Sequence, residues 1–479
     1  MPKFKIKGGV YSDTEDIGLG MSSPMLIDGY VDTRENTVKR PGAYAWVDLG
    51  TNAPVTALKN LQIASSIFAV SGGKLFRINY DQSVFEVPST YSLGMYFRPS
   101  LVTDGDTLWV AVGTDGFFYY KLAEEVGLVP IFDVNAPAYP TSLEYLLGNI
   151  ITNRLDDKYF QWAGPTSPDR FTWDALDIAE PATDPDTLVR LGLVGSDLLA
   201  FGPKSTEIWT YDGVSPFSFM TTIDKGIAAP YSFVKVGTAG FWVSETREVI
   251  AFSNRQAGEV SFPIRRILAE MPTVLDAYGM CIQVHGYTFA VWNFPSALQT
   301  WAYCIQTRQW QQWGNWISAG QEYFPYIATS SELVNIELSY GGEAVPAQTI
   351  IGTANGKILI VDSSYEKDDN MVIRLARRSG VIDYGTFRRK RSDRLTLKVS
   401  NPNNLTPHFD SVAQFNLRWR DDGGQWGMWR TIPIDGRDGD MFTATLYRLG
   451  VYSSRQYEIM HDESSGFVFV EAEEEVTVL

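Results

Sequence analysis

Carboxylates are the side chains of this sequence whose type and spacing come nearest to a catalytic set. Glycoside hydrolysis needs two of them roughly 5 to 9 Å apart, one acting as an acid and the other as a base or nucleophile. The candidates are Asp104, Asp106, Asp156, Asp157, Asp197 and Glu207. Nearly all of them stand beside glycine or within an expected hairpin turn, where aspartate caps its own backbone. The sequence therefore favours turn residues, and a carbohydrate-binding or glycosidase-like propeller is kept as the alternative.

Histidine and cysteine offer no pattern for a metal or a nucleophile. The histidines His285, His408 and His461 are widely separated, and Cys281 and Cys304 form no Cys-x-x-Cys pair. The sequence contains no HExxH helix, Gly-x-Ser-x-Gly elbow, phosphate-binding loop or dinucleotide fingerprint. We therefore expect no cofactor, no metal site and no catalytic residue.

One acidic run superficially resembles a calcium-binding loop. It is Asp435-Gly436-Arg437-Asp438-Gly439-Asp440. Arg437 stands where such a loop needs an oxygen ligand, and neither a downstream bidentate glutamate nor flanking helices are expected. The sequence favours an acidic hairpin turn at these positions.

A basic stretch stands out in a chain whose formal net charge is −16. Guanidinium groups suit carboxylate-rich partners and phosphate, so one interpretation is a docking surface. The other is a solvated linker. The residues predicted at the interface are Arg374, Arg377, Arg378, Arg388, Arg389, Lys390 and Arg391. The acidic tail, with Glu471, Glu473, Glu474 and Glu475, is a hypothetical complement on a neighbouring subunit.

A weak internal repeat must position these groups. Two apolar or aromatic strands joined by a turn recur about every 41 to 48 residues, with a longer gap before the last pair, which is close to the period of propeller blades. The first strands are Ile67–Val70, Leu108–Ala111, Ile150–Thr152, Leu198–Phe201, Phe241–Val243, Thr288–Val291 and Thr349–Ile351. Their partners are Leu75–Ile78, Phe117–Tyr120, Tyr159–Trp162, Ile208–Tyr211, Val249–Phe252, Trp301–Tyr303 and Ile358–Val361.

These pairs predict an all-β fold, a β-propeller of about seven four-stranded blades. The connecting turns include Gly72-Gly73 and Asp115-Gly116, which tolerate the positive φ of tight hairpins. We expect Tyr44–Val47 to supply the outer strand of the last blade and so close the ring. Stacked β-sandwiches are the alternative, and a single short helix is expected from Arg265 to Met271.

The domain organisation follows from these patterns. Residues 1–365 are assigned to the propeller, 366–394 to a basic linker, and 395–479 to a small C-terminal β-sandwich. Within the last part, Trp419 to Trp426 resembles the Asp-box turn of sialidase-like propellers, with Trp419 in place of its serine. This similarity predicts a β-hairpin and carries no catalytic implication.

Composition limits the classes of function. The strongly acidic balance argues against sequence-reading nucleic-acid binding, although it suits a channel that must release DNA. Two cysteines in 479 residues fit assembly in a reducing compartment. No secretory signal and no apolar run of about 18 residues occurs, so no membrane span is expected.

Several motifs resemble a known family. Asp32-Thr33-Arg34-Glu35-Asn36 with Lys39-Arg40-Pro41-Gly42 is similar to the opening of the tail-hub, or packaged-DNA stabilisation, proteins of P22-like short-tailed phages. The segment from Asp186 to Trp209 and the following Lys225-Gly226-Ile227-Ala228 resemble its central blade. Tyr447-Arg448-Leu449-Gly450 and Arg455–Ile459 resemble its closing pattern. Related tail-nozzle proteins also use propellers, so hub and nozzle are not separated.

This resemblance implies a structural virion protein with no catalytic residues. It implies a homo-oligomeric ring, a hexamer, that is assembled in the host cytoplasm and lies in the tail below the portal–adaptor proteins. The ring would seal the packaged genome, anchor tail fibres or spikes, contact a tail needle and let genomic DNA pass through its channel.

Overall fold

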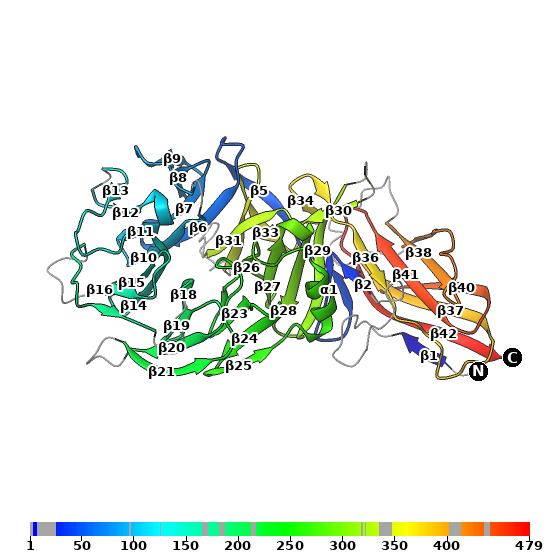
Figure 1. Cartoon of the computed structure of the whole chain (residues 1–479). Coiled ribbons are helices and arrows are strands. Elements are labelled where there is room, and N and C mark those ends of the chain that lie inside the picture. The colour runs from blue at the N-terminus through cyan, green and yellow to red at the C-terminus, as the bar shows by residue number, and fades with distance from the viewer. Residues whose placement is uncertain are drawn as a thin grey trace.

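The computed structural model has an elongated form, with a propeller at one end and a β-sandwich at the other (Figure 1). It describes residues 3–6, 25–94, 97–124, 126–164, 171–181, 187–211, 217–317, 320, 322–334, 347–401, 413–434 and 441–479. For residues 3–6 the description covers the backbone alone. The predicted fold class, a propeller followed by a small sandwich, is confirmed.

Seven four-stranded antiparallel units form the blades. The first three blades contain β6 (Val55–Leu61), β7 (Ser66–Ser71), β8 (Lys74–Asn79) and β9 (Val84–Glu86); β10 (Ser100–Thr103), β11 (Thr107–Ala111), β12 (Phe117–Lys121) and β13 (Val129–Pro130); and β14 (Pro140–Leu146), β15 (Asn149–Arg154), β16 (Phe160–Ala163) and β17 (Ile178–Ala179). The next two contain β18 (Arg190–Val194), β19 (Asp197–Phe201), β20 (Thr206–Thr210) and β21 (Ser218–Ile223); and β22 (Val234–Val236), β23 (Ala239–Val243), β24 (Val249–Ser253) and β25 (Gln256–Glu259).

The sixth and seventh blades complete the ring. They contain β26 (Tyr278–Val284), β27 (Tyr287–Phe294), β28 (Gln299–Cys304) and β29 (Gln309–Ile317); and β31 (Ala328–Val334), β32 (Gln348–Thr353), β33 (Lys357–Asp362) and β5 (Gly42–Asp48). The additional strands β30 (Glu322–Pro325), β34 (Lys367–Asp368) and β35 (Met371–Val372) extend these two sheets. The predicted short helix is α1 (Arg265–Glu270).

Apolar inner strands explain why the blades form a ring. Every residue of β7, β11 and β19 is buried, because neighbouring blades cover both faces of these strands. Inner strands of successive blades are in contact around the ring: β6 with β10, β10 with β14, β14 with β18, β18 with β23, β22 with β26, and β26 with β31. β31 of the last blade contacts β6 of the first. Outer strands such as β9 are exposed.

The N-terminal strand β5 is the outer strand of the seventh blade. It pairs antiparallel with β33, with Tyr44 opposite Ile360 and Val47 opposite Ile358. The residues that the sequence assigned to ring closure therefore occupy that position. A strand from one end of the chain thus closes a blade made from residues about 300 positions later.

The C-terminal sandwich consists of two sheets. The β37 sheet contains β3 (Gly29–Val31), β4 (Thr37–Lys39), β42 (Val468–Val478), β37 (Lys390–Ser400) and β40 (Met441–Tyr452), with β1 (Lys3–Ile6) also paired to β42. The β38 sheet contains β2 (Met25–Ile27), β36 (Leu375–Arg378), β41 (Arg455–His461), β38 (Gln414–Asp421) and β39 (Arg430–Pro433). Leu395 and Leu397 of one sheet share a buried core with Phe415 and Leu417 of the other.

Two of the predicted boundaries are wrong. Residues 366–394 are not a linker, because β34, β35 and β36 lie within them and β37 begins at Lys390. Residues 25–39 belong to the sandwich and not to the propeller, since β2, β3 and β4 lie in its two sheets. Polar and basic composition suggested a linker, but cross-strand partners distant in sequence convert these residues into strands.

Gly42 at the start of β5 gives a test of ring closure. An added Cβ at Gly42 would lie 2.2 Å from the carbonyl oxygen and 2.6 Å from the amide nitrogen of Lys367. We expect Gly42→Ala to lower the free energy of unfolding by about 2–3 kcal/mol, because backbone cannot move aside as a side chain can. Gly258→Ala in β25, where nothing lies within 4 Å, is the control and should change stability by less than about 0.5 kcal/mol in urea denaturation. Equal midpoints for the two variants would contradict this packing.

Candidate docking surface

The six carboxylates considered as catalytic candidates lie on three separate blades, where they cap turns or form hydrogen bonds and ion pairs. Asp104 caps the amide of Thr107 at 3.2 Å and accepts the indole N–H of Trp109 at 3.1 Å. Asp197 forms an ion pair with Arg255 at 2.9 Å, and Glu207 accepts the indole N–H of Trp209 at 3.0 Å.

The other carboxylates have similar roles. Asp106 accepts the Thr107 hydroxyl, Asp157 caps the Lys158 amide, and Asp156 has a positive φ in the turn after β15. No cluster of three or more His, Cys, Asp or Glu side chains that could hold a metal occurs in the described parts of the chain. His285 lies in the β26–β27 turn and His461 stacks on Phe467, while His408 and the run 435–440 lie outside the described residues.

A buried arginine joins the propeller to the sandwich. The guanidinium of Arg40 contacts Asp28 at 2.7 Å and forms a two-pronged contact with Asp368, including one hydrogen bond of 3.0 Å. It also donates to the carbonyl of Gly314 in β29 at 3.0 Å and lies over the ring of Tyr326 at 4.7 Å. Burial raises the pKa of Asp28 to about 6, against the opposing attraction of Arg40. These contacts connect the β2–β3 loop, blade six and β34 at one point.

The neighbours of Arg40 in the family-like motif each have a separate structural role. The Lys39 amine donates to the carbonyls of Glu463 at 2.6 Å and Ser465 at 3.1 Å, which anchors β4 to the turn before β42. Gly42 allows the close approach of Lys367 described above. Upstream, Asp32 caps the turn between β3 and β4 through the amides of Arg34 and Asn36 at 2.8 Å.

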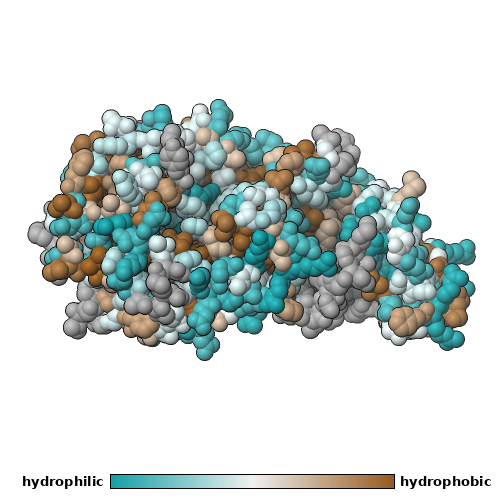
Figure 2. All heavy atoms as spheres, in the orientation of Figure 1, coloured by the Kyte–Doolittle hydropathy of each residue, from teal (hydrophilic) through white to brown (hydrophobic). Residues whose placement is uncertain are grey.

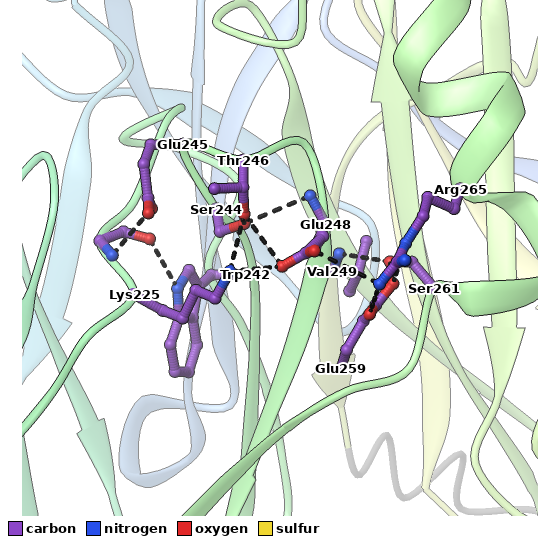
Figure 3. Close-up of polar contacts among 11 residues, drawn as sticks. Lys225, Trp242, Ser244, Glu245, Thr246, Glu248, Val249, Glu259, Ser261 and Arg265 are labelled. Atoms are coloured by element: carbon purple, nitrogen blue, oxygen red, sulfur yellow. Dashed lines mark hydrogen bonds and ion pairs between the residues drawn. The ribbon is translucent and has the colours of Figure 1, made fainter.

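The central family-like motif is also architectural. Figure 3 shows Lys225 bonded to Glu248 at 2.6 Å and to Thr246 at 2.9 Å, both at the turn before β24. The amide of Gly226 donates to Glu245 at 2.9 Å, and its carbonyl accepts the indole N–H of Trp242 at 3.0 Å. The network continues from Glu248 to Arg265 and Glu259. The motif therefore fixes the connection from blade four to blade five.

The predicted interface residues divide into three groups. Arg377 is buried beside Phe469 in the sandwich core, where burial lowers its pKa to about 10, and Lys390 is fully buried. Burial therefore corrects the prediction for these two, which cannot lie on a docking surface. Arg374 is half-buried over the ring of Trp316 at 3.6 Å, and Arg378 forms an ion pair with Glu458 at 3.3 Å.

Arg388, Arg389 and Arg391 are the exposed members of the set. The Lys390 amine donates to the carbonyls of Thr386, Arg388 and Ser453 at 2.7, 2.8 and 2.7 Å, so it holds the turn that presents its neighbours. The preceding Phe387 is 93% exposed. An apolar residue amid exposed arginines is typical of an interface anchor, and the sequence analysis missed it.

The turn that carries these residues lies beside the C-terminus, because Lys390 pairs with Val478, and Figure 1 places the C-terminus at the end of the sandwich farthest from the propeller. The amide of Leu479 donates to the carbonyl of Arg389 at 2.8 Å, and Leu479 is 55% exposed. We name Phe387, Arg388, Arg389, Arg391 and Leu479 the distal tip. Hydrophilic and hydrophobic atoms are mixed at this end of the molecule in Figure 2.

The acidic tail is not a free surface. It forms β42, in which Glu475 pairs with Arg394 at 2.6 Å and Glu471 pairs with Lys398, both on β37 of the same chain. Glu474 is buried and accepts hydrogen bonds from Tyr384 at 2.6 Å and Tyr452 at 3.0 Å. The glutamates of the tail therefore pair with basic residues of the same sheet. This corrects the expectation that their partner lies on a neighbouring subunit.

The hairpin predicted from the Asp-box similarity is formed by β38 and β39. Asp421 pairs with Arg455 at 2.6 Å, and Trp426 packs against the guanidinium groups of Arg378, Arg418 and Arg420. In the described residues, no helix has the length and apolarity needed to cross a membrane.

The comparison with protein families agrees with the fold. The family described as "Bacteriophage P22 Gp10, beta-propeller", a phage-stabilisation family, matches residues 59–329. Similar solved structures include the WD40 beta propeller domain of Doa1, at 11% identity and a TM-score of 0.43, covering 67% of this chain and 96% of that one. A chain from the S. cerevisiae complex of Dbp5 with Nup159, Gle1, IP6 and ADP has 10% identity and a TM-score of 0.41, covering 70% and 96%. No curated protein matches the sequence.

The junction gives one test of stability. We expect Arg40→Met to lower the free energy of unfolding by about 3–5 kcal/mol, because two buried carboxylates lose their counter-charge. Adding Asp28→Asn and Asp368→Asn should recover part of this loss. Arg255→Met, which removes a half-exposed ion pair, is the matched control and should cost at most about 1 kcal/mol in urea denaturation. A loss at Arg40 no larger than at Arg255 would contradict the role of the junction.

Lys39 gives a test by pH. Burial lowers the pKa of its amine to about 8, whereas an unfolded lysine titrates near 10.5. Between these values the unfolded chain holds a proton that the folded chain has lost, so this group makes the free energy of unfolding rise with pH from 8 to 10.5. The rise should be absent in Lys39→Met, and the measurement is urea denaturation of both proteins from pH 7 to 10. Parallel pH profiles would show that the amine is not desolvated in this way.

Proposed function

The chain belongs to the phage-stabilisation family described as "Bacteriophage P22 Gp10, beta-propeller", and from that membership we propose that it forms a ring in the tail of a short-tailed phage. It is a phage DNA-stabilisation or tail protein, and membership implies a virion component. The family is a structural one with no known catalytic role. The match over most of the propeller is the observation that carries this proposal.

The proposed ring lies below the portal–adaptor proteins and seals the packaged genome. The closed propeller supports this role, because it presents loops for fibres, spikes or a needle while leaving few open strand edges. A net charge of −16 also suits a channel wall that releases DNA, since like charges repel phosphate.

We assign the distal tip as the contact with the portal–adaptor complex. Three exposed arginines around Phe387 suit an acidic surface with an apolar pocket. Their backbone is held by the buried Lys390, so the tip is preorganised for binding. Arg388 and Arg389 are expected to contribute most, because Arg391 already has Asp393 as an ion partner at 2.7 Å.

The test is assembly on purified portal–adaptor rings, followed by native mass spectrometry. Wild-type protein should add to these rings in a fixed number of copies. Arg388→Glu with Arg389→Glu should weaken the addition at least tenfold, because two attractive charges become repulsive. The control carries the same change of charge on the propeller, as Lys74→Glu with Arg266→Glu, and should assemble as the wild type does.

The outcomes separate the two parts of the proposal. Wild-type protein that ignores the portal–adaptor rings would overturn the tail-ring function. Wild-type addition that persists in the Arg388 and Arg389 variant would leave that function standing and exclude the distal tip as the contact.

A further inference from the structure

The β37 sheet has two open edges, formed by β40 and by β1. β40 pairs with β37 from Met441 opposite Ser400 to Tyr452 opposite Lys390. At the opposite edge of the sheet, β1 pairs with β42. Figure 1 shows β40, β37, β42 and β1 in succession. Within the described strands, nothing pairs with the outer side of β40 or of β1. Open edges of this kind are templates for strands of another chain.

The edge formed by β40 lacks the usual protection against pairing. Met441–Tyr447 contains no charged residue, proline or glycine, and its residues favour strands. Met441 is 54% and Tyr447 is 65% exposed. Distorting features begin only afterwards, with Arg448 at φ 57° and Gly450 at φ 100°. A flat, uncharged edge of seven residues is one that a partner normally covers.

Strand direction suits a second copy of this chain as the partner. β1, β42, β37 and β40 alternate in direction, because each neighbouring pair is antiparallel. An even number of alternating strands leaves β40 antiparallel to β1 of a copy related by rotation. In a cyclic ring, the β40 edge of each copy contacts the β1 edge of the next copy. This is a heterologous contact, and it closes when the rotation between copies completes a full turn.

We propose that β40 of one subunit pairs with β1 of the next, which joins the β37 sheets of the ring into a continuous barrel. This inference rests on the ring proposed above. With about six copies and four strands from each at about 4.8 Å spacing, the barrel has a circumference of roughly 115 Å and a diameter of about 37 Å. Barrels this large enclose an aqueous channel, and this one admits a DNA duplex.

The register also identifies the face that lines the channel. The β38 sheet packs against one face of the β37 sheet, so the lumen must lie on the other face. That face carries the ion pairs of Glu475 with Arg394 and Glu471 with Lys398. Because these charges are paired across strands, the wall offers few free cations to hold DNA phosphate.

One row of residues crosses the sheet from edge to edge. Lys5 lies opposite Glu473, Glu473 opposite Thr396, and Thr396 opposite Thr445. Directly opposite residues share a face, so positions 3 and 5 of one copy meet the face of Thr443, Thr445 and Tyr447 on the next. A shift of register by two residues preserves this relation. Position 445 therefore lies in the same row as positions 3 and 5 of the neighbour, both of which are lysine in the sequence.

A charge series at Thr445 tests the contact. Thr445→Lys puts like charges across the edge and should raise the protein concentration needed for ring formation at least tenfold at low salt. Thr445→Glu puts opposite charges there and should leave ring formation as strong as in the wild type or stronger. Thr396→Lys adds the same charge to the same face one strand inside the edge, and should assemble as the wild type does. Native mass spectrometry gives the fraction in rings, and thermal melting shows that each variant is folded.

A thiol pair gives a second readout. With Cys281 and Cys304 replaced by serine, Lys5→Cys combined with Thr445→Cys should give covalent oligomers up to the closed ring when a short thiol cross-linker is added. Lys5→Cys combined with Thr396→Cys should not, because β40 separates those positions in the barrel.

The outcomes distinguish this inference from the function on which it rests. Wild-type rings that form equally well with Thr445→Lys, and that give no covalent oligomers, would overturn the edge pairing and leave the tail ring standing. Wild-type protein that forms no ring, alone or on portal–adaptor complexes, would overturn both.

Discussion

A single buried guanidinium holds the two parts of this molecule in place. Arg40 is 1% exposed and lies between the carboxylates of Asp28 and Asp368, each 0% exposed, with the carbonyl of Gly314 as a further acceptor. Burying three charges is costly, and the cost is offset only when geometry and hydrogen bonds are nearly complete. The arrangement therefore favours one relative position of the β2–β3 loop, blade six and β34 over all others. A hydrophobic contact of the same area would tolerate sliding.

The path of the N-terminal segment follows from this constraint. β2, β3 and β4 complete the sandwich, Arg40 lies at the boundary, and β5 closes the seventh blade. A continuous apolar core runs from Trp292 and Trp301 of blade six to Leu395 and Leu417 of the sandwich. Because one short segment serves both parts, closure of the ring and completion of the sandwich are coupled. We expect the two parts to unfold together.

Some charged residues have partners within the chain, and others stay exposed on the surface. Most of the basic residues between Arg374 and Arg391 have partners within the chain. Arg377 is buried in the sandwich core, Arg378 forms an ion pair with Glu458, and the amine of Lys390 donates hydrogen bonds to three carbonyls. The distal tip and the β40 edge remain available, and both belong to the sandwich. The propeller thus provides a rigid body, while the sandwich carries the surfaces proposed for assembly.

The sequence by itself determined the repeating part of the fold. Strand pairs with tight turns at a regular spacing predict blades, because each pair is a local unit whose apolar faces need neighbours on both sides. The C-terminal strands and the short helix were predictable for the same local reason, and so was the turn role of Asp104, Asp106, Asp156 and Asp157, whereas Asp197 and Glu207 lie in strands. Only the tertiary structure decided which charges are buried. Arg40 meets Asp368 across 328 positions, and Glu475 meets Arg394 across 81. Composition identified the basic segment as a linker or a surface, but an arginine is equally suited to solvent, an aromatic ring or a carboxylate. Its partner is chosen by packing between distant segments, and no local pattern encodes that choice.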